Sequence, residues 1–377
     1  MILKHLSIVT PTRLIQDGYL RLEGEKIVEI GEGEYRGAEE AFDREGLIAF
    51  PGFIDIHIHG SVGIDFMDAE VSDYPKIADS LYEEGVTTFL ATTLTSDFDS
   101  LARVCRTVKE VKEQGNVPSL AGIHFEGPYI SLKYKGAQNP EFIRDPDIEE
   151  FDKLQELSGG NVKYIAMAPE KDGAMEFISH VTKNGVVVAA GHTDATFDDV
   201  EEAIKHGLTN TTHTHNAMSP HHHRNPGVVT AAMYFDSLFT EVICDTVHVC
   251  PNTLKTFYHV VGPDRFVAIT DALKVKHTDL QEFQLFGLDC VRKPDAAYLV
   301  SGPLAGSTLS MDQALRNLAS ITGADPIALA KMTSSNAARS LHLDDIGSIE
   351  NNKKADLVLL DPDYHVVEVY KNGKKVK

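Results

Sequence analysis

The sequence has few cysteines and no long hydrophobic run. Its four cysteines, at positions 105, 244, 250 and 290, form no Cys-x-x-Cys pair, which predicts free thiols in a reducing compartment. No apolar run reaches the length of a membrane span. The apolar patch at residues 1–6 is too short for a signal peptide and lacks a cleavage pattern. We therefore expect a cytoplasmic protein that has no membrane partner.

Positive charge is also scarce, because 35 lysines and arginines face 56 aspartates and glutamates, for a formal net charge of −21. A nucleic-acid-binding surface needs positive charge to meet phosphates, so no nucleic-acid partner is expected. An anionic small substrate stays open if a local cationic pocket receives it. The length of 377 residues suits one large α/β domain plus a smaller one, or two or three medium domains.

The most informative stretch is residues 53–60, Phe-Ile-Asp-Ile-His-Ile-His-Gly, in which apolar and polar residues alternate strictly. In a strand this alternation places three isoleucines on one face and Asp55, His57 and His59 on the other. Two histidines at i and i+2 have Cα atoms ~6.6–7 Å apart, close enough for both rings to meet one cation. A pair of hydrogen-bonded polar residues at a strand end is the alternative, and this motif alone does not decide between them.

Both ends of the chain read as short strands. Residues 21–31 resemble a hairpin around a glycine turn, and residues 354–360 and 366–370 are strands, the second entering an Asn-Gly turn. Neither end has enough strands for a stable sheet. We therefore predict one small β-sandwich domain built from residues 1–49 plus 343–377, with residues 50–342 inserted between its halves.

The central segment alternates apolar strands with amphipathic helices. The candidate strands are residues 53–59, 87–94, 119–126, 162–168, 186–191, 209–214, 239–245 and 266–271. Helical spacing is clearest at 99–114 and again after Thr196, where Gly207 acts as a stop. This order predicts an α/β fold, a (β/α)₈ TIM-like barrel. A doubly wound open sheet competes, but no Gly-x-Gly-x-x-Gly turn follows the first strand.

Five of these strands end in imidazole or carboxylate groups. The residues concerned are His57, His59, Glu126, His192, His213 and Asp271. A single histidine or aspartate at a strand end is more often a cap or turn former. Because the carboxyl ends of barrel strands meet at one rim, five such ends together predict a site for Zn²⁺ or Fe²⁺.

A divalent metal would define the chemistry of such a site. It lowers the pKa of bound water from ~15.7 to around 7 and polarises a carbonyl oxygen. A weakly ligated carboxylate can take the proton of that water and return it to a leaving group. Asp271, alone at the end of the last strand, is the candidate for this carboxylate. An N-cap or a plain metal ligand is the alternative for Asp271.

Several sequence motifs resemble those of the metal-dependent amidohydrolase family. They lie, in the order found in that family, at residues 51–60, 124–129, 135–140, 191–193, 212–218, 270–272 and 304–307. Within the family they are most similar to members that deacetylate N-acetylglucosamine 6-phosphate. The resemblance implies a barrel, a small β domain from both termini, and a site with one or two divalent metals per subunit.

The resemblance also implies roles for individual residues. Glu126, His192 and His213 match the metal ligands of these deacetylases, and Glu126 stands where many amidohydrolases carry a carboxylated lysine. His57 and His59 match a second-metal pair that some members lack. The matching acid/base is Asp271. The residues that match substrate-binding positions are Ala137, Gln138, Asn216, Ala217, Arg224, His248, Leu304, Ala305 and Gly306. Family members are commonly homodimers in which the arginine matching Arg224 reaches into the partner's site.

Two positions depart from the family pattern. Gln138 sits where some members carry a histidine near the acetyl carbonyl, and an amide donates a hydrogen bond but carries no charge. His215 replaces a frequent tyrosine and is a substrate contact, an extra ligand or a packing residue. Arg224 follows the histidines 221–223, which stay unassigned, and its guanidinium suits bidentate binding of a phosphate.

The strand-end residues predict metal-dependent hydrolysis, and the resemblance implies that the bond cleaved is the acetamide of a sugar phosphate, N-acetylglucosamine 6-phosphate, in amino-sugar metabolism. Another amidohydrolase, acting on a different N-acyl group or a cyclic amide, is the nearest alternative. A non-catalytic barrel that serves as an assembly module is the alternative from another class.

Overall fold

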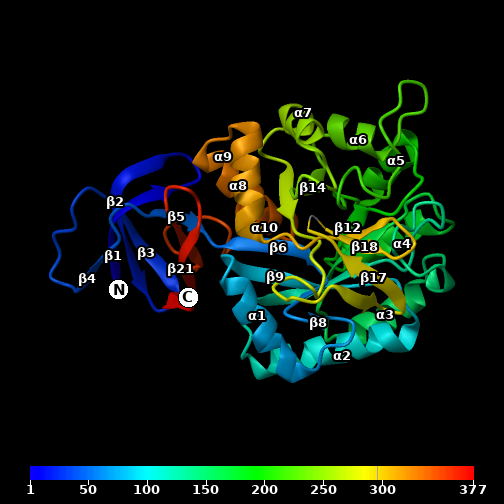
Figure 1. The fold of residues 1–377 in the computed structure, drawn as a ribbon, viewed down its shortest axis with the longest axis horizontal. Coiled ribbons are helices and arrows are strands. Elements are labelled where there is room, and N and C mark those ends of the chain that lie inside the picture. The colour runs from blue at the N-terminus through cyan, green and yellow to red at the C-terminus, as the bar shows by residue number, and fades with distance from the viewer. Residues whose placement is uncertain (295) are drawn as a thin grey trace.

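A computed structural model describes residues 1–294 and 296–377, and its larger body is a barrel of eight parallel strands (Figure 1). In order around the barrel from one end of the sheet the strands are β15 (Phe266–Ile269), β14 (Phe239–Ile243), β13 (Asn210–Thr211), β12 (Val187–Ala190), β11 (Val162–Met167), β10 (Leu120–Glu126), β9 (Val86–Thr93) and β6 (Phe53–Ile58). The Asp271 N–H donates to the His57 carbonyl at 2.8 Å, and this bond joins the first and last strands. The predicted (β/α)₈ fold is confirmed.

Helices cover the outside of the barrel. They are α1 (Tyr74–Tyr82), α2 (Phe98–Gln114), α3 (Ile148–Leu157), α4 (Ala174–Lys183), α5 (Phe197–His206), α6 (Val228–Tyr234), α7 (Pro251–Val261) and α8 (Met311–Thr322), followed by α9 (Pro326–Ala330), a π-helical turn (Lys331–Ser335) and α10 (Asn336–Ser340). None of the helices in the described part of the chain is both long and apolar enough to cross a membrane.

The local sequence explains where two predicted helices begin and end. The Asp97 side chain accepts a hydrogen bond from the Ser100 N–H at the start of α2, and Gly115 ends that helix at a φ of 67°. Thr196 and Asp199 form a reciprocal capping box at the start of α5, and Gly207 ends it at a φ of 114°. Only glycine adopts such left-handed values without cost. The position of each glycine in the sequence therefore predicts where its helix ends.

Strands from both ends of the chain share one eight-stranded sheet, which lies at the left of Figure 1 with both termini. Its order is β22 (Lys374–Lys375), β21 (Val366–Lys371), β20 (Leu357–Leu360), β5 (Ile48–Pro51), β1 (Ile2–Val9), β2 (Leu14–Glu23) and β3 (Lys26–Glu32), and β4 (Ala41–Asp43) pairs with β1. The predicted small β body formed by both termini is therefore present. The division at residues 49 and 343 stays a prediction, and its first boundary falls inside β5.

Alternate residues of β20 serve two different cores. Leu357 and Leu359 belong to the apolar core of the terminal sheet, whereas Val358 and Leu360 belong to the large core of the barrel. Because side chains of a strand point alternately to opposite faces, one short strand anchors the small body to the large one.

The chain between β15 and α8 forms an antiparallel sheet that the sequence analysis did not predict. Its strands are β16 (Glu282–Leu285), β17 (Leu288–Arg292), β18 (Ala297–Leu299) and β19 (Leu304–Gly306). A two-stranded ribbon, β7 (Gly60–Ser61) and β8 (Ile64–Asp65), follows β6. Both additions follow strands whose ends carry predicted ligands, so they extend the rim of the barrel where the site lies.

Candidate metal centre and substrate cavity

Six titratable side chains gather at the carboxyl ends of the barrel strands. They form a primary cluster, Glu126, His192 and His213, and a secondary cluster, His57, His59 and Asp271. In each cluster the possible ligand atoms lie within 4.8 Å of one another, and all six residues are buried. The structure therefore brings together the five predicted metal ligands and the predicted acid/base. His215 is in neither cluster, and its ring packs on that of Phe257 with centroids 4.7 Å apart.

Three of these residues follow their strands with unusual backbone geometry. The φ angle is 49° at His192, 31° at His213 and 48° at Asp271. Residues other than glycine seldom adopt this left-handed region, and strained backbone of this kind is concentrated at functional sites.

In the primary cluster, two imidazoles face one carboxylate oxygen. The Nε2 atoms of His192 and His213 each lie 3.0 Å from Oε1 of Glu126, and they lie 3.1 Å from each other. The opposite ring nitrogens are occupied by backbone carbonyls: Nδ1 of His192 lies 2.9 Å from the Tyr134 oxygen, and Nδ1 of His213 lies 3.1 Å from the Asn216 oxygen. Since a carbonyl only accepts, both Nδ1 atoms carry a proton.

This arrangement fits a divalent metal ion. In the neutral rings the two Nε2 lone pairs point at each other and at a carboxylate oxygen, a contact that a shared cation would stabilise. His57 Nε2 is also buried and has no hydrogen-bond partner among the described residues. Imidazole nitrogens and a carboxylate are the ligands of Zn²⁺ and Fe²⁺ sites.

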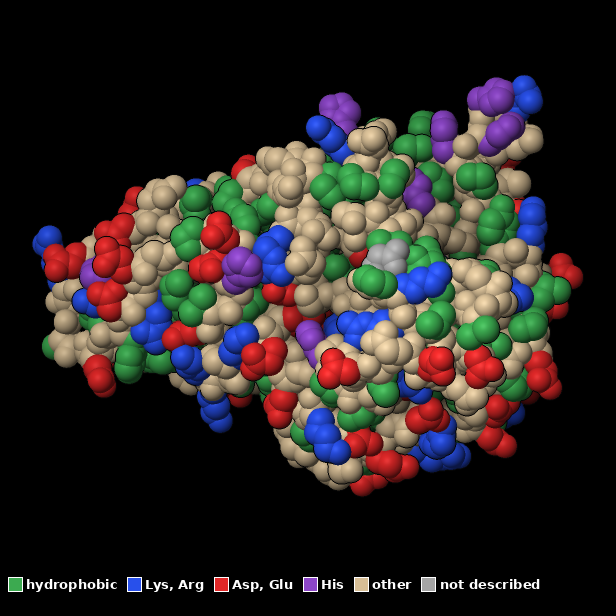
Figure 2. Space-filling view, in the orientation of Figure 1, with side chains coloured by type: hydrophobic (Ala, Val, Ile, Leu, Met, Phe, Trp, Pro, Cys, Tyr) green, Lys and Arg blue, Asp and Glu red, His purple; other side chains and the backbone are tan. Residues whose placement is uncertain are grey.

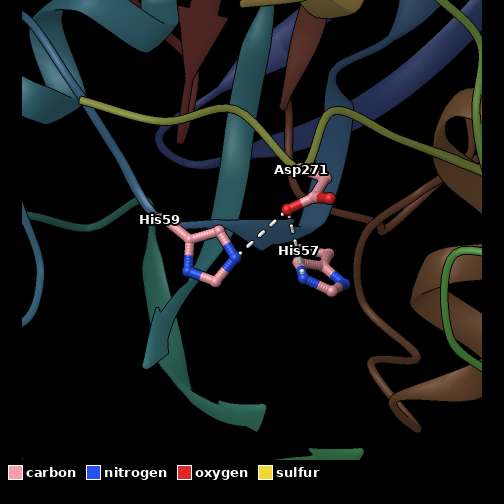
Figure 3. A group of neighbouring side chains, drawn as sticks. All are labelled: His57, His59 and Asp271. Carbon is pink, nitrogen blue, oxygen red and sulfur yellow. Dashed lines mark ion pairs between the residues drawn. The ribbon is translucent and has the colours of Figure 1, made fainter. Parts of the chain in front are cut away.

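The secondary cluster lies directly beside the primary one. Asp271 Oδ1 is 3.1 Å from His59 Nε2 and 3.5 Å from His57 Nε2, as the dashed lines in Figure 3 mark. The two carboxylate oxygens of Glu126 lie 3.3 Å from His57 Nε2 and 3.4 Å from His59 Nε2. Glu126 therefore stands between the two clusters and can contribute to both.

The charges in the site reinforce one another. Burial opposes a charge on Glu126, but the neighbouring His192 and His57 outweigh burial and hold the pKa of Glu126 well below its ordinary value. Burial likewise opposes a charge on Asp271, yet His57 and His59 lower its pKa. Both carboxylates are thus ionised, which is the state that binds a cation and accepts a proton.

A cavity of about 320 Å³ opens onto the two clusters. Its lining includes most of the residues predicted to bind metal or substrate, namely His59, Glu126, Ala137, Gln138, His192, His213, Asn216, Ala217, His248, Asp271, Leu304, Ala305 and Gly306. This volume lies within the usual range for small-molecule pockets. His57 lies beneath the cavity, with its side chain fully buried.

Arg224 lies elsewhere. It lines a neighbouring cavity of about 520 Å³, and its Nη1 atom is 2.8 Å from His223 Nε2. The loop that carries both residues protrudes between α5 and α6, and blue and purple side chains gather at its tip in Figure 2. Lys133 and Tyr134 line both cavities, so the two are adjacent. Within one chain, the structure does not bring Arg224 to the predicted substrate site.

Three polar residues behind the site were not assigned a role from the sequence. Glu241 of β14 accepts a hydrogen bond from His57 Nδ1 at 3.2 Å. The His124 ring packs on the His57 ring with centroids 4.6 Å apart. Asp55 Oδ2 accepts from the Thr270 hydroxyl at 2.6 Å and links the first and last barrel strands. The sequence signal that could have identified them is the alternation of inward and outward side chains along each strand, which places these residues on the lumenal face of the barrel.

A barrel with two adjoining groups of possible metal ligands at its carboxyl rim has the architecture of a metal-dependent hydrolase. The sequence profile of the amidohydrolase family matches residues 48–376, so the chain belongs to the amidohydrolase family.

Named relatives are similar along most of the chain. It is 36% identical to N-acetylglucosamine-6-phosphate deacetylase of Bacillus subtilis (strain 168), over 97% of this chain and 94% of the relative. It is 34% identical to N-acetylgalactosamine-6-phosphate deacetylase of Escherichia coli O157:H7, over 88% of each. A solved mutant of the Mycobacterium smegmatis N-acetylglucosamine-6-phosphate deacetylase, in complex with N-acetyl-D-glucosamine-6-phosphate, superposes with a TM-score of 0.94 at 31% identity, covering 100% of this chain and 99% of that one.

Proposed function

We propose that the protein hydrolyses the acetamide of N-acetyl-D-glucosamine 6-phosphate to D-glucosamine 6-phosphate and acetate, a reaction of amino-sugar metabolism. The convergence of Glu126, His192, His213 and Asp271 on one cavity carries this proposal. The names of relatives that match nearly the whole length of the chain support the substrate.

The donor sets support one or two divalent ions, Zn²⁺ or Fe²⁺. Glu126, His192 and His213 would hold the first, and the secondary cluster would hold the second. When bound, such an ion supplies Lewis acidity, which lowers the pKa of a coordinated water and polarises the amide carbonyl.

Asp271 moves the proton. Its ionised carboxylate lines the cavity, where it can accept a proton from the attacking water. The same oxygen atoms then return the proton to the nitrogen of the breaking C–N bond, so the amine leaves neutral. The Oδ1 atom of Asp271 lies 3.1 Å from His59 Nε2, so the carboxylate is placed beside the secondary cluster.

Gln138 orients a donor toward the reacting carbonyl. The Thr95 N–H donates to Gln138 Oε1 at 2.8 Å, which fixes the amide so that its NH₂ group faces Glu126 Oε2 at 2.5 Å. An amide nitrogen has two protons, and the second is free to donate to the oxygen that gains charge in the transition state. This neutral donor takes the place of the histidine found in some family members.

The sugar phosphate is held at the outer part of the cavity. His248 presents a ring whose Nδ1 lies 2.6 Å from Asp245 Oδ2, and this carboxylate raises the pKa of the ring although burial opposes it. The charged ring suits a phosphate. Asn216, Ala217 and residues 304–306 of β19 line the same cavity.

Arg224 contacts the substrate of a second subunit. Its position outside the cavity of its own chain supports a homodimer in which it meets the phosphate bound by the partner. The Arg224→Ala variant is then expected to raise KM for the phosphorylated substrate, and sedimentation is expected to give twice the chain mass of 41.4 kDa. The four free thiols suit a cytoplasmic enzyme.

Acetate release tests the proposed reaction. N-acetylglucosamine 6-phosphate and its mannosamine and galactosamine analogues are compared, with metal content measured in parallel. The glucosamine compound is expected to give the highest kcat/KM. A preference for the galactosamine compound, the substrate in the name of the Escherichia coli relative, would replace the proposed epimer. No acetate from any of them, with metal bound, would overturn the assignment.

A further inference from the structure

Glu241 is a carboxylate buried at the centre of a barrel strand. It is the middle residue of β14, and its side chain is 0% exposed. Burying a charge costs free energy unless the group is paired and hydrogen-bonded, so the contacts of this side chain indicate its purpose.

One oxygen of Glu241 contacts both clusters of the metal centre. Oε2 lies 3.2 Å from His57 Nδ1, and it accepts from the backbone N–H of His213 at 3.4 Å. The backbone carbonyl of Glu241 also accepts from the Thr214 N–H at 2.7 Å. Glu241 therefore supports a histidine of the secondary cluster through its ring, and one of the primary cluster through the turn that carries it.

The two nitrogens of His57 have different surroundings. Nδ1 faces Glu241, whereas Nε2 faces Glu126 Oε1 at 3.3 Å and Asp271 Oδ1 at 3.5 Å. All three carboxylates attract a ring proton, so the shortest and best-aligned contact decides where it stays. Only the contact with Glu241 meets the geometry of a hydrogen bond, because Nε2 has no such partner among the described residues.

We propose that Glu241 is a positioning residue: it holds the proton of His57 on Nδ1, directs the Nε2 lone pair at the secondary cluster, and thereby sets the metal affinity of that cluster. The inference rests on the proposed metal-dependent function. A carboxylate behind a ligating histidine fixes its tautomer and makes it a stronger donor, and losing such a partner typically weakens metal binding by about 10–100-fold.

Glu241→Gln tests this with little change of shape. Metal binding to the full chain is measured in buffers of defined free Zn²⁺, by elemental analysis after dialysis. The weaker of the two binding steps is expected to weaken about 10–100-fold, while the tighter step changes less. In a His57→Asn background the same substitution is expected to have no further effect. Unchanged binding in Glu241→Gln would overturn the proposal.

The tautomer of His57 gives a readout that a merely structural role would not move. In the metal-free full chain, at a pH high enough that the His57 ring keeps one proton, ¹⁵N NMR is expected to show that proton on Nδ1, and Glu241→Gln is expected to mix the two tautomers. Protonation mainly at Nε2 in the unmodified chain would overturn the proposal, even if the variant does not fold. Neither measurement involves acetate release, so a wrong substrate would leave both results intact.

Asp356→Asn is the matched control. Asp356 is also a buried carboxylate, 4% exposed, but it pairs with Lys371 in the terminal sheet, at 2.7 Å from its Nζ. Its replacement is expected to lower thermal stability without changing either metal-binding step or the His57 tautomer. A similar change of metal binding in this control would contradict a specific role for Glu241.

Discussion

Asp271, the proposed proton acceptor, is held ionised by two imidazoles, and it lines the cavity. Asp271→Asn keeps the shape but removes the proton acceptor. We expect kcat to fall by about 10²–10⁴, the usual contribution of general acid–base catalysis. Acetate release measures the rate, and calorimetry with the intact substrate is expected to show that binding persists. A loss of less than about tenfold would assign the proton transfer to another group.

The proposed contact of His248 with the phosphate predicts that substrate binding depends on pH. Burial opposes its charge, but the hydrogen bond and charge of Asp245 raise its pKa above the ordinary value of 6.5. The ring is charged below this raised pKa and neutral above it, so KM for the phosphorylated sugar is expected to increase as the pH rises beyond about 6.5. Asp245→Asn is expected to move that increase to lower pH.

The unphosphorylated sugar provides the control for this pH effect. Its KM is expected to stay flat over the same range, because no anion meets His248. A parallel increase for both sugars would show that the ring titration acts on something other than phosphate binding.

Side chains that act directly were easier to find from the sequence than those that act through others. His57, His59, Glu126, His192 and His213 end strands, and the barrel geometry brings them together as expected; their roles stay predictions. Tyr134 was not found, because it orients His192 through a backbone carbonyl, which every residue type has. Glu241 was missed because it lies in the middle of β14, whereas the sequence analysis looked for ligands at the ends of strands.

Strands and helices followed the sequence closely where apolar patterning was strong. The predicted strand at 87–94 is β9 (Val86–Thr93), and the helix at 99–114 is α2 (Phe98–Gln114). The sheet β16–β19 was missed because its strands are short and mostly half-exposed, so their residues show no clear alternation. Such a sheet is stabilised by its position over the barrel rather than by local propensity.

Arg144 links the loop between β10 and α3 to neighbouring segments of the chain. Arg144 forms a bidentate ion pair with Glu150 at 2.7–3.1 Å and donates to the Ser96 and Phe142 carbonyls, both at 2.8 Å. The same loop supplies Tyr134 and Gln138 to the cavity. Its geometry at the site therefore depends on contacts at its far end.

Arg144→Ala is expected to loosen that loop. A hydrogen bond to a charged group contributes about 1.5–3 kcal/mol to stability. The backbone amides of the loop are therefore expected to exchange with solvent at least about tenfold faster, and kcat/KM is expected to fall by a similar factor. Hydrogen exchange and steady-state kinetics measure both. Lys205→Ala removes an exposed ion pair with Glu202 on α5, away from the loop, and is expected to change neither. Unchanged exchange in Arg144→Ala would mean that the loop is fixed elsewhere.

The whole molecule depends on its last strands. β20 lies between β5 and β21, and its Val358 and Leu360 belong to the barrel core. Removing residues 344–377 opens the sheet and exposes both cores, so the shortened chain is expected to lose its cooperative thermal transition. Ending the chain at Gly373 removes only the short edge strand β22, and the transition is expected to persist. A cooperative transition in the longer truncation would make the barrel an independent folding unit.

The placement of β20 also has a consequence for synthesis on the ribosome. β1, β2, β3 and β5 leave the ribosome first, yet the neighbour that completes β5 is made more than 300 residues later. At ~5–20 residues per second, β5 waits for tens of seconds with one row of N–H and C=O groups unpaired. During that interval the unpaired edge of β5 can pair with a strand of another chain. Shielding by the ribosome surface or by a chaperone would then decide what fraction of the protein folds and what fraction aggregates.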